Sequence, residues 1–155
     1  MRKFRFRGKV KRVIYGYLHK RDKWVYGYLL VDDDKNKYYI ANDVAWFEGI
    51  PVGSFEIHEL YEVHPETVGQ DTGLKDKNGK EIYEGDIVKI TETTDGKDVL
   101  ALIYWKEKEA CFGWRLNFLC MLSEKNLDPN NWEVIGNIYE NPELLEEGKN
   151  EACGK

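Results

Sequence analysis

Cysteine, histidine and proline are scarce in this chain, and the pattern of the cysteines argues against a disulfide-stabilised fold. The 155 residues include 3 Cys, 3 His and 4 Pro. The cysteines, Cys111, Cys120 and Cys153, form no CxxC pair, and an odd number without such a pair is untypical of a secreted disulfide scaffold. We therefore expect reduced cysteines and a cytoplasmic location.

The chain also lacks the motifs that carry most metal and nucleophilic chemistry. His19, His58 and His64 stand in no HxH, HExxH or Cys/His cluster, which argues against a metal site. Ser54 and Ser123 lie outside any GxSxG turn, and no glycine-rich phosphate loop is present. The sequence thus predicts no catalytic residue, no metal and no cofactor.

Acidic residues are the remaining candidates for catalysis. Glu81, Glu84 and Asp86 lie close together in the sequence, but acid–base catalysis requires such carboxylates to be desolvated together. With 28 acidic residues in the chain, neighbouring pairs arise by chance. We expect a protein that is not an enzyme and rank catalysis by these carboxylates as the third hypothesis.

Long apolar runs are missing too, and no run approaches the ~18–20 residues that a membrane-spanning helix needs. The basic first residues lead into no apolar segment, so we expect neither a secretory signal nor membrane association. Hydrophobic residues make up 42% of the chain and charged residues 33%. This composition and length predict a globular protein of one or two domains.

Aromatic residues, in contrast, are abundant and favour β-strands. They make up 14% of the chain, with 5 Trp and 10 Tyr, and such residues suit pleated surfaces. Residues 14–18 nearly repeat residues 25–29, which predicts a pair of strands. The predicted strands are 14–18, 23–31, 37–40, 55–61, 87–91, 98–105, 112–118 and 132–139, with a loop at 47–52.

Glycine-containing turns join the strands of the second half. Asn78-Gly79 predicts a type I′ turn, because both residues accept positive φ. Asn141 and Pro142 predict the start of a short helix that ends before Gly148. The residues that we expect to be needed for turns or close packing are Gly73, Asn78, Gly79, Gly85, Asp86, Gly136 and Pro142.

These elements predict a mostly β fold, a β-rich form of the α+β class. We expect a small N-terminal β subdomain over residues 1–65 and a C-terminal domain over residues 66–147. The strand and turn order of the second half resembles an SH3-like β-barrel with one short C-terminal helix. Residues 148–155 are predicted to be a flexible tail.

Charge is distributed unevenly along the chain, whose net charge is −5. Residues 1–65 carry 12 basic and 9 acidic residues (+3), and residues 66–155 carry 11 and 19 (−8). Basic residues beside exposed aromatics suit a nucleic-acid or protein partner, whereas Trp24, Tyr26 and Tyr28 as one alternating set also suit a core or an oligomer contact. The candidate partner surface is Arg5, Arg7, Lys9, Arg12, Tyr15, Tyr17, Trp24 and Tyr26.

Several sequence blocks, taken in their order along the chain, resemble the YopX family, whose members are encoded by bacteriophages and prophages. The resemblance runs from about Phe6 to Glu147, with extra residues between Lys9 and Lys23. It implies a mostly β fold with a C-terminal barrel and a cytoplasmic accessory role in a bacterial host, and it transfers no catalytic residue or cofactor. The blocks are Phe6–Lys9, Trp24–Leu29, Val63–Gln70, Thr72–Val88 (TGLKDKNGKEIYEGDIV) and Val134–Leu145 (VIGNIYENPELL).

Together these observations predict a non-enzymatic accessory protein that acts by binding. The first hypothesis is protein–protein binding, including assembly with its own copies into a homo-oligomer. Nucleic-acid binding through the basic aromatic N-terminal segment is the alternative.

Overall fold

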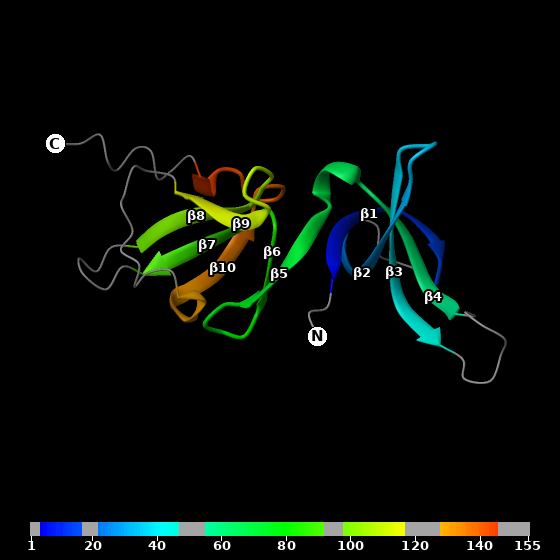
Figure 1. Ribbon diagram of the computed structural model, residues 1–155, viewed down its shortest axis with the longest axis horizontal. Helices are drawn as coiled ribbons and strands as arrows, with labels where there is room; N and C mark the ends of the chain where they lie inside the picture. The colour runs from blue at the N-terminus through cyan, green and yellow to red at the C-terminus, as the bar shows by residue number, and fades with distance from the viewer. Residues whose placement is uncertain (1–3, 17–21, 47–54, 92–97, 117–127, 146–155) are drawn as a thin grey trace. The chain divides into compact units, whose positions relative to one another are not determined.

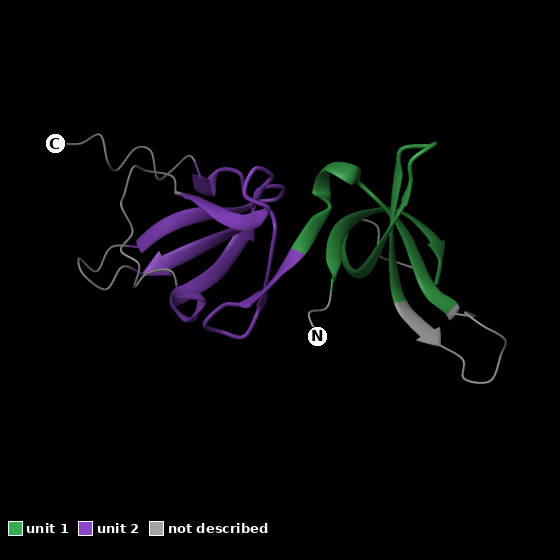
Figure 2. Cartoon of the chain, viewed as in Figure 1, with its two compact units in different colours: residues 1–70 green, residues 71–155 purple. Residues whose placement is uncertain are grey.

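The computed structural model describes residues 4–16, 22–46, 55–91, 98–116 and 128–145, which are rich in β-strands (Figure 1). The mostly β prediction is confirmed. The chain divides into unit 1, Met1–Gln70, and unit 2, Asp71–Lys155 (Figure 2). The predicted tail at 148–155 lies outside the described residues.

The boundary lies between Gln70 and Asp71, whereas the sequence predicts it after Pro65. The 3-10 helix η1 (Pro65–Thr67) and the first residues of β5 (Gly69–Lys75) bond to unit 1. The backbone N–H of Lys9 donates to Thr67 Oγ1 at 2.9 Å, and Phe6 pairs with Gln70. These bonds hold residues 66–70 to unit 1.

Unit 1 is a closed ring of antiparallel strands. The strands β1 (Phe6–Tyr15), β2 (Trp24–Asp32), β3 (Lys37–Trp46) and β4 (Phe55–Val63) pair in sequence order. Strand β1 closes the ring because it pairs with β2 at one end and with β4 at the other (Figure 1). The closed barrel therefore lies in the N-terminal half of the chain.

Strand β1 reaches both neighbours because it bends. Residues 6–9 pair with β2, and residues 10–15 pair with β4. The β1–β4 register shifts between Val10 and Arg12 and again between Val13 and Tyr15. Such bulges bend a strand and raise its twist, which a small barrel needs to close.

The barrel core comes from alternate residues of each strand. Its fully buried members are Val10, Val25, Ile40, Tyr61 and Val63. Each buried aliphatic side chain of this size stabilises the fold by about 1.5–3 kcal/mol.

Strands β2 and β3 approach closely at a glycine of the barrel. A Cβ at Gly27 would collide with the carbonyl oxygen of Ala41. Glycine is therefore required at position 27.

Of the predicted strands 14–18 and 25–29, the second lies within β2 and the first overlaps the end of β1, but their described residues do not pair with each other. Gly8 and Val25 are register partners, as are Lys9 and Trp24, so the N-terminal part of β1 pairs with β2. Tyr15 is paired instead with Leu60 of β4. The likeness between the two segments did not reveal that β1 begins earlier, at Phe6, and bends between two neighbours.

Unit 2 contains a four-stranded antiparallel sheet in the order β10-β7-β8-β9. Its strands are β7 (Asp86–Thr91), β8 (Asp98–Lys106), β9 (Cys111–Leu116) and β10 (Trp132–Asn137), and the 3-10 helix η3 (Pro129–Asn131) precedes β10. The short strand β6 (Glu81–Tyr83) pairs with β5. The SH3-like assignment stays a prediction. The predicted loop at 47–52 lies outside the described residues.

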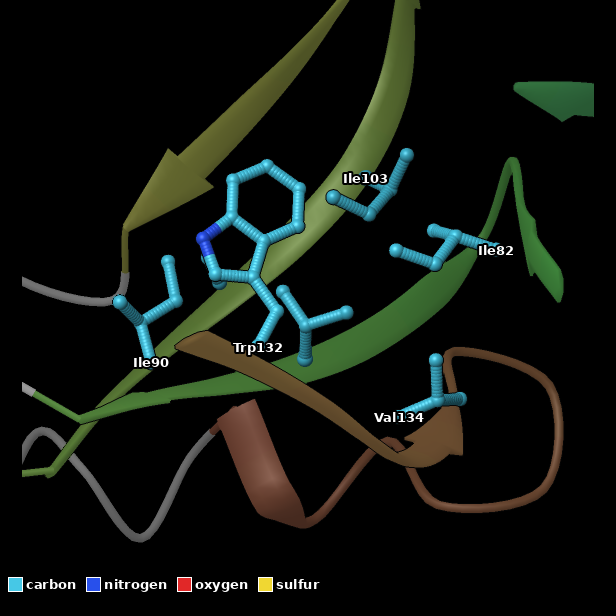
Figure 3. Close-up of a cluster of buried hydrophobic side chains, with 7 residues drawn as sticks. Ile82, Ile90, Ile103, Trp132 and Val134 are labelled. Carbon is cyan, nitrogen blue, oxygen red and sulfur yellow. The ribbon is translucent and has the colours of Figure 1, made fainter. Parts of the chain in front are cut away.

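One apolar cluster holds unit 2 together (Figure 3). Trp132 of β10 packs edge-on against Trp114 of β9, with 5.9 Å between ring centroids. Ile82 brings β6 into the same cluster. The other buried members are Val88, Ile90, Ala101, Ile103 and Val134.

A buried aspartate organises the β5–β6 hairpin. Asp76 Oδ1 accepts hydrogen bonds from the backbone N–H of Asn78 at 2.8 Å and of Lys80 at 2.9 Å. Asp76 Oδ2 accepts from the backbone N–H of Val134 at 3.0 Å, which ties the hairpin to β10. The predicted type I′ turn is wrong, because Gly79 has positive φ and Asn78 does not; the three-residue loop ends in a left-handed glycine.

The second turn of unit 2 depends on close packing as well as on backbone conformation. Gly85 has φ +82°, and a Cβ there would lie 2.9 Å from Tyr139 Cε2. The carbonyl of Gly85 accepts from the N–H of Ile138 at 2.9 Å. Gly73 has φ +78° in the adjoining bulge of β5.

The segment after β10 folds into turns around a buried asparagine. Asn137 Oδ1 accepts from the N–H groups of Tyr139 and Glu140, both at 3.0 Å. A Cβ at Gly136 would lie 2.6 Å from Asn141 Oδ1. The N–H of Leu145 donates to the carbonyl of Pro142 at 3.1 Å, and the rest of the predicted helix lies outside the described residues.

We expect Gly85→Ala to destabilise the protein by about 2–4 kcal/mol and Gly79→Ala by about 1 kcal/mol. Both residues have positive φ, which costs an alanine roughly 1–2 kcal/mol. Only Gly85 would also collide with a neighbour, since nothing lies within 4 Å of a Cβ at Gly79. Urea denaturation measures both free energies, and equal losses would show that Tyr139 yields without cost.

We expect Asp76→Asn to destabilise the protein by about 1–3 kcal/mol. Burial by itself would raise the pKa of Asp76, but hydrogen bonds from the N–H groups of Val134, Lys80 and Asn78 outweigh it and lower the pKa. An asparagine offers one acceptor oxygen where two are used. Urea denaturation near neutral pH measures the loss.

The same substitution should flatten the dependence of stability on pH. A carboxylate whose pKa is lowered by folding contributes fully above its unfolded pKa of about 3.9, and this contribution is lost as pH falls through the folded pKa. The free energy of unfolding should therefore fall more steeply below pH ~4 in the wild type than in Asp76→Asn. Parallel curves for the two proteins would contradict this assignment.

Candidate functional site

The outer surface of the barrel carries two adjacent rows of side chains that cross all of β1–β4. The first row is set by cross-strand pairs of the backbone: Tyr28 with Ala41, Ala41 with Leu60, and Leu60 with Tyr15. Side chains of such pairs lie on the same face of a sheet. Tyr28 is 56% exposed and Tyr15 is 61% exposed, whereas Ala41 is buried between its neighbours. This row is therefore an apolar strip with an exposed tyrosine at each end.

The second row is built in the same way and contains charge. Leu30 is paired with Tyr39, Tyr39 with Glu62, and Glu62 with Arg12. Leu30 is 43% exposed, so the row begins apolar and ends with a salt bridge. We name the two rows together the tyrosine face: Tyr15, Tyr28, Ala41, Leu60, Arg12, Leu30, Tyr39 and Glu62.

Glu62 holds its negative charge although it is buried. Its Oε2 lies 3.0 Å from Arg12 Nη2, and its Oε1 lies 3.3 Å from Lys11 Nζ. Burial by itself would raise the pKa of Glu62, but the hydrogen bond from Lys11 and the charges of Lys37 and Arg12 outweigh it and lower the pKa. Glu62 is therefore ionised at neutral pH, and it fixes two cations on the face.

Three of the predicted surface residues meet beside the tyrosine face. Arg7 is the register partner of Tyr26, and its guanidinium carbon lies 4.8 Å from the centroid of the Trp24 ring. Tyr26 is 42% exposed, but Arg7 is only 5% exposed. A cation stacked on an aromatic ring in this way supports the barrel wall, so Arg7 is not an exposed contact for a partner.

The other predicted surface residues are distributed around the barrel. Tyr15 and Arg12 belong to the tyrosine face. Lys9 is half-buried on β1 opposite Trp24, and Arg5 is half-buried just before β1. Tyr17 lies outside the described residues.

The interpretation of Tyr26 and Tyr28 as core residues is wrong, while the oligomer contact weighed for Trp24, Tyr26 and Tyr28 stays a prediction. Their neighbours on β2, Val25 and Leu29, pack into the barrel core, so the tyrosines face outward. The alternation itself was visible in the sequence, but either set of residues could have been the inner one. Gly27 shows which set of residues is the inner one. A Cβ at this position would collide with the backbone of Ala41, so the side of β2 that carries Gly27 has no room here for a side chain.

The sequence did not reveal Leu30, Tyr39, Leu60 and Glu62 as members of this surface. Leu30 continues the outward alternation of Tyr26 and Tyr28, so the period of two could have identified it. The other three depend on the register of β3 and β4, which no local pattern specifies.

The candidate carboxylates of unit 2 all accept hydrogen bonds that hold the fold. Asp86 is 1% exposed, and its Oδ2 accepts from the N–H of Tyr83 at 2.8 Å. Glu81 accepts from the Tyr83 hydroxyl at 3.0 Å, and Glu84 accepts from the N–H of Trp105 at 3.3 Å. These bonds give each carboxylate a structural role at the β6–β7 turn.

A small apolar hollow lies among the described residues of unit 2. Its volume is about 40 Å³, close to that of a single water, whereas small-molecule pockets measure about 300–1,000 Å³. Its lining residues are Thr72, Leu74, Ile82, Ile103, Phe112, Gly113, Trp114 and Trp132. The hollow is a packing gap at the edge of the core.

The described ranges contain no group of three or more His, Cys, Asp or Glu residues placed to hold a metal ion. Within them, no helix has the length and apolar character needed to cross a membrane.

Comparison with known proteins identifies the class of this chain. Residues 16–146 match the family described as YopX protein, so the chain belongs to the YopX family. Among solved structures it is similar to the protein EF1440 from Enterococcus faecalis, with a TM-score of 0.55 and 25% sequence identity over 92% of this chain and 98% of that one. No curated protein matches the chain.

Proposed function

We propose that this YopX protein is not an enzyme and acts by binding another protein through the tyrosine face and the adjacent Tyr26. The observation that carries the proposal is the concentration of exposed large apolar side chains on the outside of unit 1. Tyr15, Tyr26, Tyr28 and Leu30 are each between 42% and 61% exposed. Protein-binding surfaces are enriched in tyrosine, whose large and rigid ring buries much area at a low entropic cost.

The closed barrel supports recognition by side chains. A strand at the edge of a sheet binds partners through its free N–H and C=O groups. Each of the described strands β1–β4 bonds to two neighbouring strands, in part through different residues, so none of these four is an edge strand and a partner of this barrel meets mainly its outward side chains.

Protein is favoured over nucleic acid as the partner because the surface offers few cations to a phosphate chain. Arg7 is buried against Trp24, and Glu62 offsets part of the charge of Arg12 and Lys11. A nucleic-acid strand brings a negative charge every few ångströms, which is more than this small positive surplus can neutralise.

Membership of the YopX family also supports a proposal about where this binding takes place. The family supports a role as an accessory protein of a bacteriophage or prophage, and the reduced cysteines expected from the sequence support action in the cytoplasm of the bacterial host. The partner is either a host or phage protein or another copy of this chain in a homo-oligomer.

The test compares capture by the wild type and by the double variant Tyr26→Ser, Tyr28→Ser. Each immobilised protein is incubated with an extract of cells that carry the gene, with and without nuclease, and retained proteins are identified by mass spectrometry. We expect the wild type to retain specific proteins that the double variant loses, because two exposed rings are removed without touching the core.

The matched control is Ile135→Ser, which changes a side chain that is 36% exposed on β10 of unit 2. It should retain the same proteins as the wild type. Circular dichroism of all three proteins shows whether each is folded. Equal retention by the double variant, or loss of retention after nuclease treatment, would contradict protein binding through this surface.

A further inference from the structure

The charge on the tyrosine face narrows the kind of protein that it can bind. Three cations act on Glu62, namely Lys11, Lys37 and Arg12. Glu62 supplies one negative charge, and Asp32, the register partner of Lys37, is balanced by Lys35 in an ion pair of 3.3 Å. Three minus one therefore leaves a surplus of two positive charges around Glu62. The side chains of Lys11 and Arg12 are 53% and 58% exposed, so they reach a partner while they stay bound to Glu62.

The surplus charge lies directly beside apolar surface. Arg12 and Glu62 end the row that begins with Leu30 and Tyr39, and Lys37 is two residues from Tyr39 on the same side of β3. A partner that covers this row contacts the apolar side chains at one end and the cations at the other end. On this geometry, and resting on the proposed function, we infer that the tyrosine face binds an acidic segment of a partner protein in which carboxylates and apolar side chains are interspersed.

Like charge opposes pairing of this face with the same face of a second copy. Each face brings a surplus of two positive charges, and burying both sets together costs free energy. A polyanion is also a poor match, because its charge greatly exceeds the surplus available. One or two carboxylates flanked by leucine or phenylalanine side chains satisfy both parts of the face.

The test uses three probes with the intact chain. One is a short synthetic peptide in which Glu is interspersed with Leu and Phe, the second has Lys in place of every Glu, and the third is oligothymidylate. Titration by NMR follows the backbone amides of β1–β4 and measures the affinity of each probe. We expect the glutamate peptide to bind, to shift amides around Tyr28 and Tyr39, and to weaken as salt is added.

Substitutions that change the charge of the tyrosine face test the inference more directly than the choice of probe does. Arg12→Gln and Lys37→Gln should each weaken binding of the glutamate peptide about two- to fivefold, the size of one exposed ion pair. Glu62→Gln should strengthen it by a similar factor, because the surplus rises by one. A residue with a merely structural role would not raise affinity when it is replaced.

Lys108→Gln is the matched control, since it removes one exposed positive charge in the β8–β9 turn of unit 2. Its affinity should equal that of the wild type. If thermal melting shows that Glu62→Gln is unfolded, Arg12→Gln and Lys37→Gln alone decide the inference, because both change exposed or half-exposed side chains.

Several results would overturn the inference. These are equal binding of the lysine peptide, binding of oligothymidylate alone, or the same loss in Lys108→Gln. Self-association in sedimentation velocity that depends on Tyr28, without binding of the glutamate peptide, would assign the face to a second copy. If the double tyrosine variant still loses its captured proteins, the proposed function stands and only the acidic chemistry of the partner is wrong.

Discussion

The double pairing of β1 is the constraint on which unit 1 depends. One strand bonds to β2 with its first residues and to β4 with its last, and the bulges between Val10 and Tyr15 make this possible. Once the ring is closed, each side chain of the wall points either inward or outward. The inner set is Val10, Val25, Ile40, Tyr61 and Val63, and the outer set includes the tyrosine face. The tyrosine face is thus a direct result of barrel closure.

Unit 2 is organised by buried polar groups as much as by its apolar core. Asp76, Asp86 and Asn137 are each at least nine-tenths buried and accept hydrogen bonds from backbone N–H groups of turns. Leaving such N–H groups without acceptors inside a protein costs about 1–3 kcal/mol each. These three residues lie in the sequence blocks Thr72–Val88 and Val134–Leu145. The same blocks contain the glycines of the turns, Gly79, Gly85 and Gly136. Much of what the two blocks specify is therefore the geometry of these turns.

The sequence was sufficient to predict those parts of the fold that depend on local chemistry. The alternation of β2, the run Ile87–Thr91 and the position, though not the type, of the turn after Asp76 follow from period, β-propensity and turn residues. Barrel closure was not predictable, because the two halves of β1 pair with strands far apart in the sequence. The tyrosine face was only partly predictable for the same reason: Tyr15 and Arg12 were identified, but Glu62 joins Arg12 through a strand register that residue spacing does not specify.

Ala41 sets the shape of the middle of the outer surface. It lies between Tyr28 and Leu60, it is 2% exposed, and its side chain is a single methyl group. Because this methyl group is already enclosed, a larger residue would be overpacked, which costs roughly 1–3 kcal/mol. The centre of the strip is therefore held small by packing, and the relief of the outer surface comes from the exposed residues at its ends.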